Sequence, residues 1–315
     1  MERKYELLTD DTIIVSGHKL FRICASISFN NIEAGEKGGY IESEKNLAHE
    51  RDAWVSGNAQ VSGNAQVTGN AQVSGNARIS GNAHVTSNAQ VSGNARAIGN
   101  ARVSGNARVI GNARISGNAQ IDGDACVFGE TRVFGNAQVS GNAQIDGNAQ
   151  INGDARVIGN AQVSGNAHVT GNAHVTSNAH VTGNAWVSGN AWVSGNAHVT
   201  GNAWVSGNAQ IDGNARVIGN AQVSGNARVI CNAQINGDAC VSSDTHYLCI
   251  SPIGSRNDAI TFTRTKEHKI AVAVGCFRGD IDQFEAQVKA THGENEHAKT
   301  YMLAARLART RIDLS

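Results

Sequence analysis

One feature constrains this chain more than any other: a six-residue repeat that runs through most of its length without insertion or deletion. Valine or isoleucine recurs every six positions from Val55 to Val241, over 32 units, and Ala97 is the only lapse. Chains with a short fixed period form arrays in which each unit packs on its neighbours along the stack. The central segment is therefore one uninterrupted array.

Each unit has the pattern Ala-x-Val-Ser-Gly-Asn, as in the stretch AWVSGN from Ala185 to Asn190. Its first four residues alternate in polarity with a period of two, which indicates a short strand with alanine and valine inward and x and serine outward. Glycine and asparagine are the residues that best tolerate a positive φ, so they predict a tight corner after each strand. We expect the corner asparagines to form hydrogen-bonded ladders along the stack.

Composition supports an array over an ordinary globular core. The chain has 36 glycines, a single proline and only 5% aromatic residues, which differs from typical globular usage. Its net charge is zero, so nothing in the charge balance indicates nucleic acid or an anionic membrane.

Three units would make one triangular turn of a parallel β-helix. This pattern resembles the hexapeptide-repeat superfamily, whose members form left-handed β-helices, and the left hand is implied by that resemblance alone. The stretch IEAGEKGGYIESEKNLAHERDAWV, which leads into the first unit, resembles the entry segment of phage- and prophage-borne YdcK-type proteins, a largely uncharacterised group. We therefore expect an all-β solenoid, a left-handed parallel β-helix of about ten coils, of phage or prophage origin.

Three domains follow from where the repeat starts and stops. Residues 1–51 contain apolar β-prone runs and form an N-terminal β cap, residues 52–245 form the hexapeptide-repeat β-helix, and residues 246–315 form a small C-terminal ββαα module. Caps are expected because an open solenoid end exposes unpaired strand edges.

The C-terminal module is predicted from turn and capping signals. AITFTRTKEHKIAVAVGCF reads as a β-hairpin that turns near 266–268,. Asp280 and Gln283 are the N-cap and N3 residues of a helix that runs through His292. A second helix follows, and its apolar residues are Tyr301, Leu303, Ala304, Leu307 and Ile312,.

Location and redox state are inferred from missing signals. The start, MERKYELLTDDT, lacks the apolar core of a secretory signal, and no apolar run is long enough to span a bilayer,. The six cysteines show no zinc-ligand spacing,. We expect a cytoplasmic protein, in the host cell cytoplasm if it is phage-encoded, with free thiols, no membrane contact and no cofactor.

The outward x positions carry the candidate binding residues, since residues three units apart lie above one another on the same face. Two groups stand out. The His/Trp belt consists of His168, His174, His180, Trp186, Trp192, His198 and Trp204. The arginine belt consists of Arg96, Arg102, Arg108 and Arg114 on all three faces, continued by Arg78 and Arg132 on one. Trp54 has the same position in the first unit and is expected to point outward too.

Each belt has two interpretations. Stacked Trp and His rings offer flat faces to a base, a sugar or an aromatic partner, and an arginine ladder could hold phosphates. Alternatively, repeats copied by local duplication share substitutions without selection for binding, since any soluble side chain fits an outward position. Both interpretations remain open from the sequence.

Apolar residues at the outward Ser/Thr position favour a protein interface. Ile110 and Phe128 are neighbours in one column, and Ile98 and Phe134 lie two coils apart in another. Together with the tryptophans they would suit the side-by-side trimer common in the resembled superfamily.

Catalysis has less support. The resemblance to hexapeptide acyltransferases implies an acyl-CoA site between subunits with a histidine as general base, but those enzymes usually interrupt the repeat with a loop and this chain does not. His168, His174 and His180 lie on three different faces, which disfavours a metal site. No catalytic residue or metal ligand is assigned.

We therefore expect a non-enzymatic, self-associating scaffold or host-interaction rod. The alternatives are an acyltransferase-like trimer that uses acyl-CoA and a protein that sequesters a nucleotide or macromolecule. A homotrimer is the favoured partner arrangement, a host protein or a nucleotide are further candidates, and nucleic acid is disfavoured.

Overall fold

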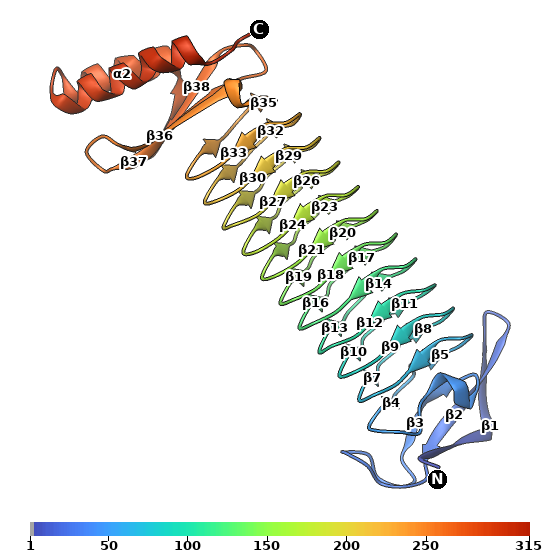
Figure 1. Ribbon diagram of the computed structural model, residues 1–315. Coiled ribbons are helices and arrows are strands. Elements are labelled where there is room, and N and C mark those ends of the chain that lie inside the picture. The colour runs from blue at the N-terminus through green and yellow to red at the C-terminus, as the bar shows by residue number, and fades with distance from the viewer. Residues whose placement is uncertain (1–2) are drawn as a thin grey trace. The chain divides into compact units, whose positions relative to one another are not determined.

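The computed structural model describes residues 3–315. It divides into two compact units, Met1–Gly165 and Asn166–Ser315. Figure 1 shows the same construction in both: short strands joined by tight corners, wound into parallel sheets. The β-solenoid prediction is confirmed, with about 11 turns in the two units together. Its left hand stays a prediction from the family resemblance.

The inward positions form the core. The alanine and the valine or isoleucine of every unit are buried, with an exposed fraction of at most 1%, and the x residues beside them, except Trp54, are exposed or half-buried. The core is therefore made of small aliphatic columns. Thr131 is the exception at an alanine position, and its buried hydroxyl has no hydrogen-bond partner in the described chain.

The corners behave as the Gly-Asn pair predicts. The corner glycines have φ between 60° and 79°, and Ser87, Ser177 and Cys231 adopt φ 61° at the same position. Asparagine side chains form ladders; Asn64 donates to Asn82 at 3.1 Å and Asn82 to Asn100 at 3.0 Å. Aspartate takes part only as an acceptor, so at Asp124, which accepts from Asn106, the upward donation stops,.

The first unit holds three runs of parallel strands, each named here by its first strand. The β5 face consists of β5 (Gln60–Val61), β8 (Arg78–Ile79), β11 (Arg96–Ala97), β14 (Arg114–Ile115), β17 (Arg132–Val133) and β20 (Gln150–Ile151). The β4 face consists of β4 (Trp54–Val55), β7 (Gln72–Val73), β10 (Gln90–Val91), β13 (Arg108–Val109), β16 (Cys126–Val127), β19 (Gln144–Ile145) and β22 (Gln162–Val163). The β6 face consists of β6 (Gln66–Val67), β9 (His84–Val85), β12 (Arg102–Val103), β15 (Gln120–Ile121), β18 (Gln138–Val139) and β21 (Arg156–Val157).

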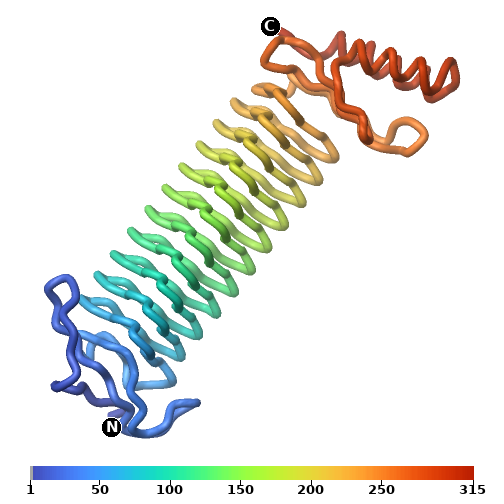
Figure 2. Tube along the Cα trace, turned by 180° about the vertical axis from the view of Figure 1, so that it is seen from behind, coloured from blue at the N-terminus to red at the C-terminus, as the bar shows by residue number. Residues whose placement is uncertain are grey.

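The N-terminal cap is an antiparallel extension of the β5 face. Strands β1 (Tyr5–Val15) and β2 (His18–Ala25) form a hairpin, and β3 (Lys37–Ile41) pairs antiparallel with β2 and parallel with β5. A short 3₁₀ helix, Glu44–Asn46, follows. The hairpin turns at Ser16 and Gly17, both with positive φ, and its tip lies beside the first coils in both views (Figures 1 and 2). The cap thus covers the solenoid end and part of one face.

The expectation that Trp54 points to solvent is wrong. Its indole is 1% exposed because the cap packs over it: Tyr5 and Phe29 contact it edge-on, with centroid distances of 6.5 and 5.4 Å. Beside it the buried ammonium of Lys4 donates to the Ala53 carbonyl at 2.7 Å. Burial lowers the pKa of Lys4 to about 8, against the opposing charge of Asp52. The first coil is therefore part of the cap's core.

The second unit repeats the three runs. The β23 face consists of β23 (His168–Val169), β26 (Trp186–Val187), β29 (Trp204–Val205), β32 (Gln222–Val223) and β35 (Cys240–Val241). The β24 face consists of β24 (His174–Val175), β27 (Trp192–Val193), β30 (Gln210–Ile211) and β33 (Arg228–Val229). The β25 face consists of β25 (His180–Val181), β28 (His198–Val199), β31 (Arg216–Val217) and β34 (Gln234–Ile235).

The C-terminal module contains the predicted hairpin and two helices, with a strand added on each side of the hairpin. After a 3₁₀ turn, Asp244–His246, its antiparallel sheet has the order β36 (Tyr247–Ile253), β37 (Asp258–Arg264), β38 (Ile270–Val274) and β39 (Phe277–Asp280). Helices α1 (Ile281–His292) and α2 (Glu296–Arg311) follow. The predicted capping box is present, because Asp280 accepts from the Gln283 amide and the Gln283 side chain accepts from Asp280.

The apolar residues named for the second helix divide into two groups. Tyr301, Ala304 and Ile312 pack into the module core, but Leu303 and Leu307 are 67% and 48% exposed. Small residues, Ala298, Ala305 and Ala308, complete the buried stripe of α2.

Candidate functional site: two outward belts and a covered cavity

The His/Trp belt lies in the second unit, at the outward position of seven successive strands, β23–β29. Strand pairing places the rings in columns as the repeat predicts: Trp186 pairs with His168 and Trp204, Trp192 with His174, and His198 with His180. The three indoles are 39–47% exposed, and the imidazoles are half-buried. The belt is therefore a real surface feature on all three faces.

Within each column the rings contact one another. Trp186 and Trp204 stack with centroids 5.6 Å apart, and His180 and His198 stack at 4.8 Å. His168 meets Trp186 edge-on at 4.8 Å. Each of two indole N–H groups reaches back to a threonine hydroxyl at 3.3 Å, Trp186 to Thr170 and Trp192 to Thr176. These contacts fix the rings in an ordered ladder.

This stacking changes the chemistry expected of the belt. The ring faces that Trp186 and Trp204 turn toward each other are already in contact, so a ligand approaching from the side meets ring edges. An edge-on apolar ridge suits the surface of a protein partner better than insertion of a base between flat faces. The sequence could not show this, because ring orientation depends on the neighbours above and below.

One imidazole in the belt has a shifted pKa. Partial burial lowers the pKa of His198 below its usual value, and the neighbouring His180 and Arg216 lower it further. Arg216 lies in the next coil of the same column. The surroundings of His198 therefore favour its neutral form.

The arginine belt lies in the first unit. Arg78, Arg96, Arg114 and Arg132 pair in register on successive strands of the β5 face, which places them about 4.8 Å apart. Arg102 and Arg108 lie on the β6 and β4 faces. Within residues 3–315, no carboxylate lies within ion-pair distance of any of these six arginines. The predicted ladder is present and its charges are not neutralised by neighbours.

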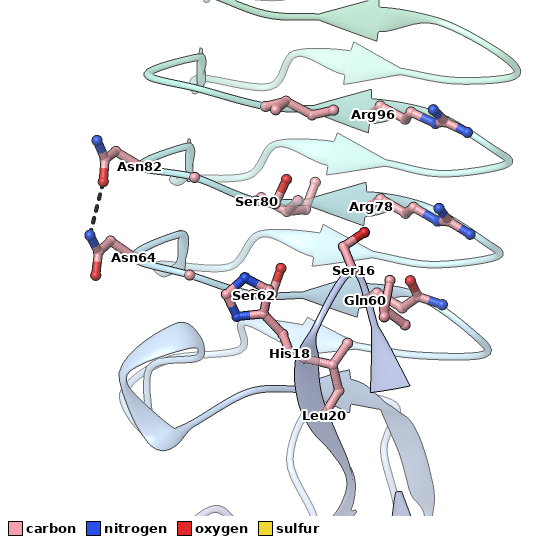
Figure 3. Close-up of a pocket in the computed structure, with 15 residues that line it drawn as sticks. Ser16, His18, Leu20, Gln60, Ser62, Asn64, Arg78, Ser80, Asn82 and Arg96 are labelled. Carbon is pink, nitrogen blue, oxygen red and sulfur yellow. Dashed lines mark hydrogen bonds between the residues drawn. The ribbon is translucent and has the colours of Figure 1, made fainter. Parts of the chain in front are cut away.

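The start of this ladder is covered by the N-terminal hairpin, and the sequence analysis missed this. A cavity of about 460 Å³ lies between the hairpin tip and the first coils of the β5 face. Arg78 and Arg96 line it, together with Ser16 and His18 from the hairpin (Figure 3). The sequence predicted only a β cap over residues 1–51, since nothing in it gives the direction in which the hairpin leans.

The predicted apolar interface residues divide into two classes. Ile98 and Ile110 are 39% and 40% exposed, whereas Phe128 and Phe134 are half-buried. The phenylalanines thus offer less surface than their outward position suggested. Ile98 also lines the covered cavity.

The described residues were also compared with the requirements of metal sites, disulfides and membrane-spanning helices. In the described part of the chain, no group of three or more His, Cys, Asp or Glu side chains is placed to hold a metal ion. All six cysteines are free thiols. Neither helix of the C-terminal module is long and apolar enough to cross a bilayer, and the rest of residues 3–315 contains no such helix.

Comparison with known proteins supports the repeat architecture. The YdcK β-solenoid repeat model matches residues 59–75, 71–87, 101–117, 161–176 and 221–237. Among curated proteins, no sequence matches the chain. Among solved structures, the chain is similar to a UDP-N-acetylglucosamine acyltransferase from Campylobacter jejuni, with 14% identity over 77% of this chain and 90% of that chain and a TM-score of 0.27. The repeat matches and the fold together identify the chain as a β-solenoid protein with YdcK-type repeats.

Proposed function

We propose that the protein is a non-enzymatic scaffold that associates with copies of itself through the β23 face. The observation that carries this proposal is the stacked indole pair of Trp186 and Trp204, which are 39% and 47% exposed at positions where the repeat usually has glutamine. Aromatic side chains are enriched in protein interfaces. Covering the exposed part of each indole would contribute about 2 kcal/mol.

A second copy is the partner that the surface suits best. Two solenoids side by side present the same coil spacing, so ridges and grooves can stay in register over several coils. The chain has zero net charge, so copies do not repel one another at long range. Threonine and serine hydroxyls beside the indoles, such as Thr170, can supply the polar rim that such interfaces need.

The histidines have a packing role in this proposal. His180 and His198 stack on each other, and His168 packs against the edge of Trp186. A general base needs a neighbour that orients it toward substrate, and these rings are oriented by their aromatic neighbours instead. The oligomer we propose is a closed, symmetric one, with the trimer suggested by the family resemblance as the first candidate.

Sedimentation velocity at micromolar concentration tests the proposal. We expect an oligomer for the wild type and a shift toward the monomer for the double variant Trp186→Gln/Trp204→Gln, with unchanged circular dichroism because the core is untouched. Trp192→Gln is the matched control, since it removes an indole of equal exposure (47%) from the β24 face, and it should shift the mass less.

Two results would refute self-association through this face. One is a wild-type monomer at the highest concentration tested. The other is an oligomer whose mass is the same in the wild type and in Trp186→Gln/Trp204→Gln.

A further inference from the structure

The cavity under the N-terminal hairpin combines positive charge with partial enclosure. Its walls come from two parts of the chain. The hairpin contributes Val15, Ser16, His18 and Leu20, and the first coils contribute Gln60, Ser62, Ser80, Arg78, Arg96 and Ile98 among others. A volume of about 460 Å³ is within the range of small-molecule sites.

The charge in this cavity comes from two neighbouring arginines. Figure 3 shows Arg78 and Arg96 one above the other, with their side chains pointing the same way, and Ser16 of the hairpin at a level between Arg78 and Gln60. Their strands pair in register, so the two guanidinium groups can reach one ligand together. In the described residues neither of them has an ion-pair partner.

An acidic residue beside the hairpin, Glu42, already has hydrogen-bond donors of its own. The carboxylate of Glu42 accepts from His18 Nδ1 at 2.9 Å and from the Gly63 backbone N–H at 2.6 Å. These two hydrogen bonds, that from His18 first, lower the pKa of Glu42, although slight burial opposes the shift. Glu42 is therefore held by these partners, and it is not among the residues that line the cavity.

The other walls suit the remainder of a small molecule. Ser62 and Ser80 supply hydroxyl groups, and Gln60 has a carboxamide oxygen that makes no hydrogen bond in the described part of the chain. Val15, Leu20 and Ile98 supply apolar surface. Few polar groups placed beside apolar walls are typical of ligand pockets.

We propose that this cavity binds a small phosphorylated molecule, with its phosphate groups held by Arg78 and Arg96. Guanidinium groups bind phosphate oxygens through paired, charge-assisted hydrogen bonds. The hairpin reduces access of water, which strengthens these contacts compared with the open arginines farther along the column. The site is separate from the proposed association surface, so each proposal can fail alone.

Isothermal titration of the full-length protein with inorganic pyrophosphate at low salt tests the site. We expect saturable one-to-one binding, and at least a tenfold loss in Arg78→Gln/Arg96→Gln, because each charge-assisted contact is worth about a factor of ten or more. The matched control is Arg114→Gln/Arg132→Gln. It makes the same change in net charge on the same column, outside the cavity, and should leave the affinity unchanged.

A second variant tests enclosure without removing charge. Ser80→Trp places an indole in the cavity, and the fold should accept it because Ile98, Phe128 and Phe134 have the same repeat position. We expect this variant to lose pyrophosphate binding with both arginines intact.

Three results would overturn the proposal. The first is no pyrophosphate binding by the wild type at millimolar concentration. The second is equal weakening in the two arginine double variants. The third is tight binding of a single-stranded oligonucleotide that depends on Arg114 and Arg132 as much as on Arg78 and Arg96, since it would assign the whole column to a polyanion.

Discussion

The arginine column of the first unit and the aromatic column of the second occupy the same position of the same repeat, yet their side chains behave differently. In the first, four like charges follow one another on paired strands without carboxylate partners. In the second, His168, Trp186 and Trp204 pack ring against ring, 4.8 and 5.6 Å apart. The inward residues beneath both columns are equally buried.

This comparison teaches that backbone and surface are specified separately. The inward aliphatic residues and the corners determine the geometry of each coil. The outward position accepts charged or aromatic side chains without a change in that geometry. Functional differences between the two units must therefore come from the outward columns and from what covers them. The hairpin covers the start of the arginine column, whereas no such element of the second unit covers its aromatic column.

The largest effect is expected when a negative charge is placed either at an inward or at an outward position of the same strand. Ile121 is fully buried, and its neighbour Gln120 is exposed on β15. Ile121→Asp buries an unpaired carboxylate and should destabilise the protein by more than about 3 kcal/mol. Gln120→Asp should change the free energy of unfolding by less than about 0.5 kcal/mol. Urea unfolding followed by circular dichroism measures both, and equal losses would contradict the assignment of inward and outward positions.

A smaller effect is expected at the corners. A Cβ at Gly105, where φ is 67°, would lie 2.6 Å from the backbone nitrogen of Gly123 in the next coil, whereas a Cβ at Gly237, with φ 61°, meets nothing within 4 Å. Gly237→Ala should therefore cost only the conformational penalty, about 1 kcal/mol. Gly105→Ala should cost at least about 2 kcal/mol, since the stack must open. Ser87 shows that the backbone conformation alone is tolerated.

Thermal unfolding of the two alanine variants separates these contributions. A Gly237→Ala variant that loses as much stability as Gly105→Ala would mean that close stacking of coils does not limit the corner residue.

Much of the fold could be predicted from the sequence because its causes are local. The period of six, the Gly-Asn corners and the Asp280–Gln283 capping box each depend on residues within a few positions of one another, and all three are confirmed. Burial of Trp54 could not be predicted, since it depends on Tyr5 and Phe29 folding back over the first coil. The exposure of Leu303 likewise depends on which stripe of α2 faces the sheet.

For the candidate site, the sequence predicted only which residues share a column. Strand pairing follows from the repeat, so the residues that share a column could be named in advance. The contacts that these columns make could not be named in advance. Trp186 stacks on Trp204 across neighbouring coils, and Arg78 is enclosed by the hairpin, which is a separate element. The chemistry of these surfaces depends on those contacts more than on residue type.

The smallest effect is expected in the pH dependence of stability, through the titration of His198. The pKa of His198 is lowered in the folded protein, so below about pH 6.5, the ordinary histidine value, the unfolded chain binds more protons than the folded one. Stability contributed by this residue is therefore present above that pH and is lost as the pH falls toward its folded pKa. The unfolding temperature should decrease between pH 7 and pH 5, and His198→Gln should make the decrease shallower.

Two further variants check the cause of this pH dependence. Arg216→Gln removes a positive charge that opposes protonation of His198, so it should also reduce the pH dependence. Trp204→Gln changes an aromatic outward residue without a titrating group and should leave the slope as in the wild type. If all three variants keep the wild-type slope, the acid sensitivity arises elsewhere, with the cap's His49 as the first candidate, since burial lowers its pKa too. In that case the column of His180 and His198 would be as indifferent to pH as the arginine column.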